Sequence, residues 1–302
     1  MPRCGIDLGG TKIAAVVLDD RGRLIWERRV ATPRENYDGT IEAIAGLVAE
    51  ADRAAGSRCS IGVGTPGAIS PATGLVKNAN STWLIGRRLH EDLERRLGRD
   101  VRLANDANCL AVSEAADGAA AGARVVFSVI LGTGVGGGLA IDGAAITGAN
   151  AIAGEWGHNP LPWPEASELP GPACYCGKHG CVETFLSGPG LAADYQRESG
   201  AGATGEDVVR RANEREAAAV AVLERWERRL AKSLATVINI VDPGVIVVGG
   251  GLSRIARIYE DVPREWARWV FSDRVDTQFV PATHGDASGV RGAAWLWASQ
   301  VA

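Results

Sequence analysis

The segment CGIDLGGTKIAAVVL, residues 4–18, decides how this chain folds. Its two apolar runs, Cys4–Leu8 and Ile13–Leu18, flank a pair of glycines, a pattern that predicts two short strands joined by a turn. Leu24–Val30 adds a third strand. Because glycine has no Cβ, the backbone N–H groups of such a turn can approach an anion closely.

The same arrangement recurs in the second half of the chain. Val125–Leu131 and Leu139–Asp142 are predicted strands on either side of GTGVGGG, residues 132–138. The recurrence indicates an internal duplication, and the mixture of strands and helices predicts an α/β protein of two related lobes with a cleft between them. One such turn alone reads as an ordinary hairpin, whereas a pair in equivalent positions favours the binding of nucleotide phosphates. Neither turn fits a P-loop or a dinucleotide-binding fingerprint.

Other periodic segments complete the expected α/β pattern. Further strands are predicted at Cys59–Thr65, Val101–Ala104 and Val245–Val248, the last ending in three glycines, residues 249–251. Helices are predicted over Tyr37–Gly56 and over about 107–117, 205–214, 216–239 and 288–299.

Composition excludes several classes of protein. The chain has 302 residues, 46% hydrophobic and 23% charged, with a net charge of −4, so there is no basic surface for nucleic acid or for a membrane. No apolar run approaches the ~18 residues of a spanning helix. The first strand begins at about residue 4, which leaves no room for a signal peptide. We expect a cytoplasmic protein.

Three closely spaced cysteines indicate a metal site. Cys174, Cys176 and Cys181 follow His158 by sixteen residues or more, and in a reducing compartment such a cluster favours metal over disulfides. Three thiolates and one imidazole form a closed tetrahedral shell for a structural Zn²⁺. His158 and His179 are both candidates for the fourth ligand.

Two aspartates are candidates for chemistry. Asp7 lies in an apolar strand, where its charge requires a partner, either Mg²⁺ held together with phosphates or the nearby Lys12. Asp106 follows Asn105 where a strand gives way to a helix, so this pair is either a helix cap or places a general base for phosphoryl transfer. If His158 binds the metal, its second nitrogen can hold a substrate hydroxyl, and Glu155 and Glu183 can accept hydroxyl protons from the same polyol.

Taken together, the motifs resemble the ROK family of bacterial sugar kinases and sugar-responsive repressors. The motifs concerned are DLGGT at residues 7–11, ND at 105–106, GTGVGG at 132–137, EWGH at 155–158 and CYCGKHGCVE at 174–183. Segments 77–84, 153–163 and 284–291 further resemble the bacterial manno(fructo)kinase branch of that family.

The resemblance implies the actin-like ATPase (ribonuclease H-like) fold and a role for each motif. Asp106 would activate the 6-hydroxyl of the sugar. The other sugar hydroxyls would be held by Asn80, Asn105, Glu155, His158 and Glu183. ATP would be bound by Asp7, Gly9, Gly10, Thr11, Lys12, Gly132, Thr133, Gly134, Gly136, Gly249, Gly250 and Gly251. Asp7 would also act on Mg²⁺ indirectly, and zinc would be held by His158, Cys174, Cys176 and Cys181.

The expected protein is therefore an ATP-dependent hexose kinase. The resemblance implies fructose as acceptor, a fructokinase, with mannose as a second substrate and a homodimeric assembly. A kinase for glucose, N-acetylglucosamine or N-acetylmannosamine is the first alternative, and a non-catalytic sugar sensor is another. We expect a small lobe of residues 1–118, with a helix at about 286–302 packing back on it, and a large lobe of 119–285 that contains the zinc loop. The spacer between His158 and Cys174 is longer and richer in proline than in many members of the family.

Overall fold

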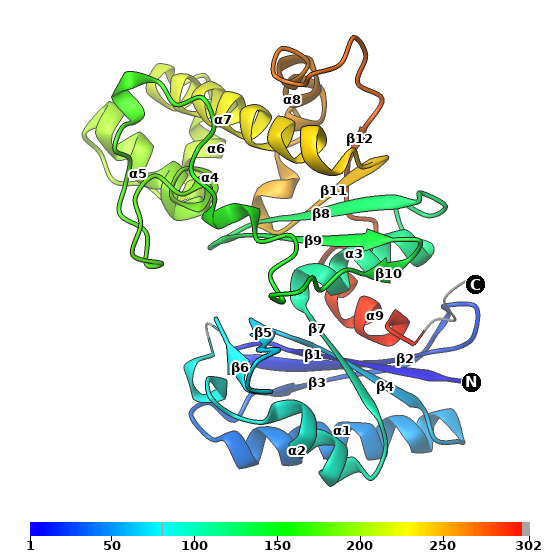
Figure 1. Cartoon of the computed structure of the whole chain (residues 1–302). Coiled ribbons are helices and arrows are strands. Elements are labelled where there is room, and N and C mark those ends of the chain that lie inside the picture. The colour runs from blue at the N-terminus through cyan, green and yellow to red at the C-terminus, as the bar shows by residue number, and fades with distance from the viewer. Residues whose placement is uncertain (80, 298–302) are drawn as a thin grey trace. The chain divides into compact units, whose positions relative to one another are not determined.

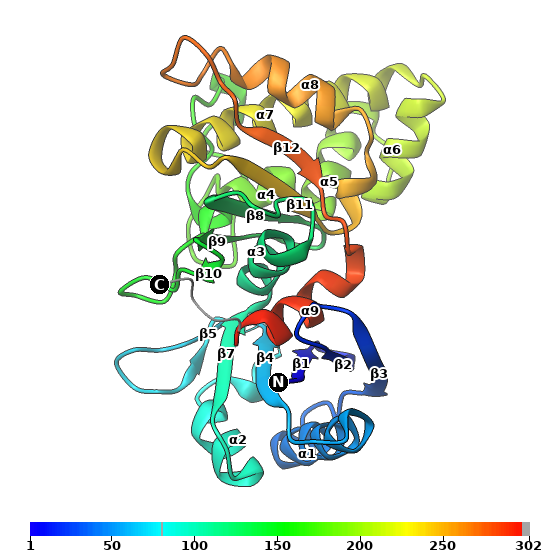
Figure 2. The same ribbon diagram turned by 90° about the vertical axis from the view of Figure 1, so that its right-hand side faces the viewer.

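The chain forms two compact units, which are described one at a time (Figures 1 and 2). A computed structural model describes residues 1–79 and 81–297; the predicted sugar ligand Asn80 and residues 298–302 lie outside the described residues. The first unit comprises residues 1–128, 138–154 and 282–302, and the second comprises 129–137 and 155–281.

The first unit is built on a five-stranded sheet of order β3-β2-β1-β4-β7. Its strands are β1 (Arg3–Leu8), β2 (Lys12–Leu18), β3 (Leu24–Ala31), β4 (Ser60–Thr65) and β7 (Val101–Asn105). The first three run antiparallel, and β4 and β7 add in parallel. All five strands lie where the sequence predicted them.

Helices cover both faces of this sheet. α1 (Tyr37–Ala55) and α2 (Leu89–Leu97) lie on one face, and α9 (Ser288–Trp295) lies on the other with α3 (Asp106–Asp117) against it (Figure 1). α1 begins at the Asn36 cap and ends at Gly56 in the left-handed conformation. α9 packs so closely that a Cβ on Gly62 would lie 1.8 Å from the Ala293 oxygen, so only glycine fits there.

Short elements complete this unit. They are β5 (Ala68–Ile69), β6 (Val76–Lys77), β10 (Ala144–Ala145) and the 3₁₀ turns η1 (Thr82–Leu84) and η5 (Gly285–Ala287).

A second sheet has the order β10-β9-β8-β11-β12. It contains β8 (Val125–Leu131), β9 (Val135–Ile141), β11 (Val245–Gly249) and β12 (Gln278–Pro281). If the strands of each sheet are numbered in chain order, both sheets have the same spatial order: third, second, first, fourth, fifth. This shared order agrees with the predicted duplication.

One predicted strand boundary was wrong. The strand expected at 139–142 begins at Val135, so the glycines at 136–138 belong to β9 and the turn is shorter. The physical reason is the approach of α3: a Cβ on Gly138 would lie 2.4 Å from the oxygen of Ala107.

The second unit packs its helices around α7 (Ala217–Val241), whose Trp226, Leu230 and Leu234 are fully buried. The other helices are α4 (Val182–Leu186), α5 (Gly188–Ser199), α6 (Gly205–Asn213) and α8 (Ile258–Trp266). The 3₁₀ turns are η2 (Trp156–His158), η3 (Ala166–Glu168) and η4 (Gly251–Arg254). Among the described residues, every helix is too short or too polar to cross a membrane.

Candidate active site

In the first unit, Asp7 leads into the glycine turn between β1 and β2. The turn is closed by the Gly9 N–H, which donates to the Lys12 oxygen at 3.1 Å, and the Thr32 hydroxyl donates to the Gly9 oxygen at 2.7 Å. Thr11 and Lys12 are exposed and Gly10 is half-buried. The turn therefore presents its backbone to solvent, as a site for phosphate oxygens requires.

Asn105 and Asp106 lie where β7 meets α3. The Asn105 side chain caps the helix by accepting the Ala107 N–H at 2.9 Å and donates to the Gly67 oxygen at 3.1 Å. Asp106 also accepts the Ala107 N–H, at 2.8 Å, through Oδ1. The helix-cap and general-base interpretations of this pair are compatible. Asn105 caps the helix, and Asp106 is an exposed carboxylate at the carboxyl end of a parallel strand.

The pKa values of Asp7 and Asp106 are both raised. Burial and the charge of Asp106 raise the pKa of Asp7 to about 6, with Lys12 and Arg29 acting in the opposite direction. Desolvation by the surrounding residues likewise raises the pKa of Asp106, while hydrogen bonds from the Ala107 N–H and from Asn105 lower it. Carboxylates with raised pKa values are frequent at active sites, and a divalent cation would relieve the repulsion. The oxygen donors at Asp7 are the type that Mg²⁺ prefers.

In the second unit, the glycine turn between β8 and β9 is held from three directions. Glu183 accepts the Val135 N–H at 2.9 Å, Trp156 donates from Nε1 to the Gly136 oxygen at 2.8 Å, and the Gly188 N–H donates to the Gly132 oxygen at 2.8 Å. Glu183 is thus a neighbour of the predicted phosphate turn. This contact of Trp156 was not predicted from the sequence, although the residue lies inside the EWGH motif.

His158 and the three cysteines come together as predicted. One ligand atom from each of His158, Cys174, Cys176 and Cys181 lies within 4.8 Å of all the others. The His158 Nδ1 is 3.6 Å from the Cys174 Sγ, and the Sγ atoms of Cys176 and Cys181 are 3.6 Å apart. Tetrahedral zinc with bonds of about 2.3 Å to sulfur separates its sulfurs by about 3.8 Å, so this donor set fits zinc. Of the two competing histidines, His158 is in the group.

Tyr175 is an unexpected neighbour of this group. Its hydroxyl lies 2.9 Å from the His158 Nε2, on the nitrogen that faces away from the cysteines, and the residue is 84% exposed. The position expected for a sugar hydroxyl is thus taken by a movable side chain. Glu155, which precedes η2, is exposed, and Glu183 is half-buried.

The third glycine run follows β11. Gly249 ends the strand, and Gly250 adopts a φ of 84°, where an added Cβ would also lie 2.4 Å from the Leu131 oxygen. Only glycine satisfies both constraints. Gly251 opens η4 and is exposed.

Comparisons with known proteins place the chain in a family. The family model of the ROK family matches residues 3–300. The chain belongs to the ROK family. Among curated relatives, it is 42% identical to the N-acetyl-D-glucosamine kinase of Shigella boydii serotype 4 (strain Sb227) over 305 residues, which cover 97% of this chain and 98% of the relative. The N-acetyl-D-glucosamine kinase of Escherichia coli O1:K1 / APEC is also 42% identical, over 296 residues with the same coverage.

Solved structures agree with the family. The ROK hexokinase from Thermus thermophilus superposes with a TM-score of 0.86 at 32% identity, covering 98% of this chain and 97% of that one. A ROK glucokinase from Streptomyces griseus, in complex with glucose and AMPPNP, gives 0.75 at 29% identity, covering 97% and 98%. The actin-like ATPase fold and the sugar-kinase class are therefore confirmed. The predicted fructokinase branch is not confirmed, because these relatives are N-acetylglucosamine kinases.

Proposed function

We propose that the protein transfers the γ-phosphate of ATP to the 6-hydroxyl of N-acetyl-D-glucosamine. The observation that carries the choice of sugar is 42% identity over 97% of the chain to kinases of that sugar. The motif resemblance to manno(fructo)kinases keeps fructose as the second candidate. We also propose a cytoplasmic location.

Asp106 is the proposed general base. An exposed carboxylate with a raised pKa can accept the proton of the attacking hydroxyl as the bond to phosphorus forms. Asn105 fixes the start of α3 and thereby the position of Asp106.

The glycine turns are the proposed phosphate ligands. Backbone N–H groups of residues 9–12 and 132–136 would bind the phosphates of ATP, with Gly249, Gly250 and Gly251 providing room for the nucleoside. Mg²⁺, held through Asp7, would neutralise charge on the transferred phosphate.

Sugar hydroxyls would be held by Asn80, Asn105, Glu155, His158 and Glu183, and zinc would fix the ring of His158. Bound zinc leaves the proton on the His158 nitrogen that now faces Tyr175, so this N–H is a donor for a sugar oxygen once Tyr175 turns away.

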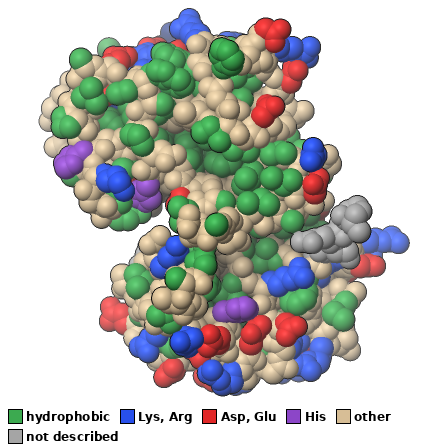
Figure 3. Space-filling model, in the orientation of Figure 1, with side chains coloured by type: hydrophobic (Ala, Val, Ile, Leu, Met, Phe, Trp, Pro, Cys, Tyr) green, Lys and Arg blue, Asp and Glu red, His purple; other side chains and the backbone are tan. Residues whose placement is uncertain are grey.

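The test is ADP release with N-acetylglucosamine, glucose, N-acetylmannosamine, fructose and mannose measured side by side. The highest kcat/KM with N-acetylglucosamine supports the proposal. A preference for fructose, with mannose next, would instead favour the substrate of the manno(fructo)kinase branch. Absence of turnover with every sugar, in folded zinc-containing protein, refutes the kinase and favours a sugar sensor. On the face that Figure 3 displays, acidic and basic side chains are interspersed over the surface.

A further inference from the structure

The long spacer between His158 and Cys174 is part of the backbone network of the metal site. We call residues 159–173 the connector. The Leu161 N–H donates to the Gly180 oxygen and the Gly180 N–H to the Pro172 oxygen, both at 2.8 Å. The Val182 N–H donates to the Asn159 oxygen at 2.9 Å. Both ends of the connector are therefore hydrogen-bonded to the loop that carries the cysteines.

A buried glutamate anchors the middle of the connector. Glu168, in η3, is only 7% exposed. Its Oε2 accepts the Glu165 N–H at 2.8 Å, which closes a capping box, and its Oε1 accepts Arg229 Nε at 2.6 Å. A buried carboxylate is stable only when its oxygens are paired in this way.

Arg229 belongs to α7 and is itself 5% exposed. Besides Glu168 it donates from Nη1 to Asp194 of α5 at 2.6 Å, and its guanidinium lies 4.9 Å from the centre of the Phe185 ring of α4. The arginine is thus shared by the connector and by two helices next to it. Removing one member of such a buried group leaves the other charges without a partner, so the loss of Arg229 would disturb both Glu168 and Asp194.

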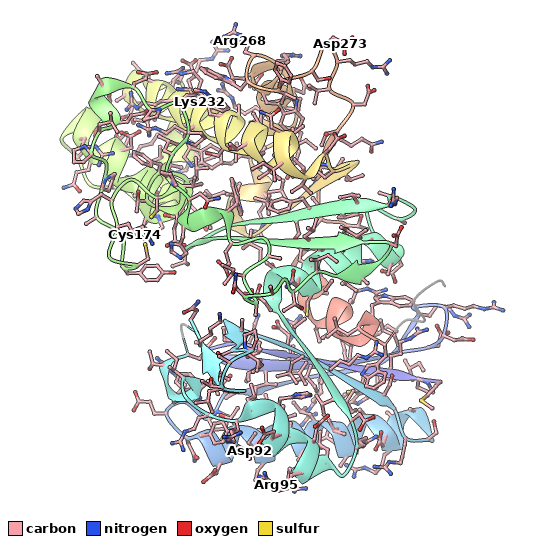
Figure 4. The ribbon with its side chains drawn as sticks, in the orientation of Figure 1. Asp92, Arg95, Cys174, Lys232, Arg268 and Asp273 are labelled. Atoms are coloured by element: carbon pink, nitrogen blue, oxygen red, sulfur yellow. The ribbon has the colours of Figure 1, made fainter. Side chains whose placement is uncertain are left out.

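A second attachment lies one turn further along α7. Lys232 donates from Nζ to the Trp163 oxygen at 2.9 Å and lies 5.0 Å from the centre of the Trp269 ring. The Trp269 ring packs at a tilt against the Trp163 ring, with 5.1 Å between their centres. Figure 4 shows Lys232 on α7 and Cys174 on the loop within the same unit. The connector is therefore attached to α7 at Trp163 and at Glu168.

We propose that Arg229 and Lys232 are positioning residues for the zinc site: by fixing the connector on α7, they set the position of His158 relative to the cysteines and thereby how slowly zinc is released. This inference goes beyond the proposed kinase function, since it concerns the retention of the metal and does not depend on the sugar.

The test follows zinc loss from the purified holoprotein. Zinc per chain is measured first, and the rate of transfer to an excess of a chromogenic chelator second. We expect Arg229→Met to release zinc at least about tenfold faster, and Lys232→Met to do so by a smaller factor. The matched control is Arg225→Met: Arg225 also lies on α7 and also binds Asp194, at 3.0 Å, but its other partner is Glu198 of α5, outside the connector. Its release rate should stay within about twofold of wild type.

Thermal denaturation and circular dichroism verify that each variant is folded. Zinc release from folded Arg229→Met at the wild-type rate overturns the proposal. Two other results also overturn it: an equal acceleration of zinc release in Arg225→Met, and a wild-type protein that contains no zinc. If Arg229→Met fails to fold, Lys232→Met decides by the same criterion. Because no readout uses a sugar, failure of this proposal is distinguishable from failure of the kinase assignment.

Discussion

Replacing Glu114 by alanine should destabilise the first unit severely. This carboxylate of α3 is completely buried and accepts four hydrogen bonds. Its Oε1 accepts from the His284 N–H at 3.2 Å and the Ser288 hydroxyl at 2.9 Å. Its Oε2 accepts from the Ala119 N–H at 2.8 Å and the Thr283 N–H at 3.0 Å. Segment 284–291, which resembles the manno(fructo)kinase branch, is thus hydrogen-bonded to α3.

The magnitude follows from the donors that alanine leaves behind. Three partly buried N–H groups and one buried hydroxyl lose their acceptor, at about 1 kcal/mol each or more, so the free energy of unfolding should fall by about 4 kcal/mol. That is a large share of the stability of a typical domain, about 5–15 kcal/mol.

Urea unfolding followed by tryptophan fluorescence and far-ultraviolet circular dichroism measures the change. Glu91→Ala is the control, because that carboxylate is 48% exposed and pairs with Arg88 at the surface, so its loss should cost no more than about 0.5 kcal/mol. A loss below about 1 kcal/mol for Glu114→Ala would show that water replaces these hydrogen bonds and that the estimate is wrong.

Three further outcomes are expected. Asp106→Asn should lower kcat by about 10²–10⁴-fold with little change in the KM for ATP, and retained turnover would exclude it as the base. The folded pKa of Asp7 is raised from 3.8 to about 6, so ionisation of Asp7 lowers the stability of the metal-free protein as the pH rises between those values. Asp7→Asn should therefore raise the free energy of unfolding at pH 7 by up to about 3 kcal/mol. Equal melting temperatures of the variant and the wild type in EDTA would contradict this. Cys176→Ser should lower zinc content and raise the KM for the sugar more than that for ATP; a zinc-free variant with an unchanged sugar KM would separate the metal from the site.

Periodic segments were predictable from the sequence and weakly patterned ones were not. β1, β2 and α1 carry long apolar patterns, and they form where expected. α2 buries only Leu89 and Leu93 in a highly charged segment, so its short stripe gave little signal. α8 contains Pro263, which argues against a helix, yet Ile258, Val262 and Trp266 are buried on one side of it. In both helices, packing outweighs local preference.

The same distinction applies to the candidate site. The spacing of the cysteines predicted their grouping, because the loop between them is short. The hydrogen bond from the Val135 N–H to Glu183 joins residues 48 positions apart, and the one from Trp156 to Gly136 joins residues 20 apart. Such contacts depend on how the elements fold onto one another, and no local sequence pattern predicts them. The roles of the individual site residues stay predictions.

The first unit is assembled from three stretches of chain, and the last of them matters for biosynthesis. α9 contributes Val290 and Ala294 to a small core with Ala14, Val16 and Leu18 of β2. During translation, all the strands of the sheet that contains β2 are synthesised long before residues 282–302, so the apolar face that α9 covers lacks this helix for more than half of translation. A chain that stops before residue 282 would keep that face exposed, a feature that invites aggregation and recognition by chaperones.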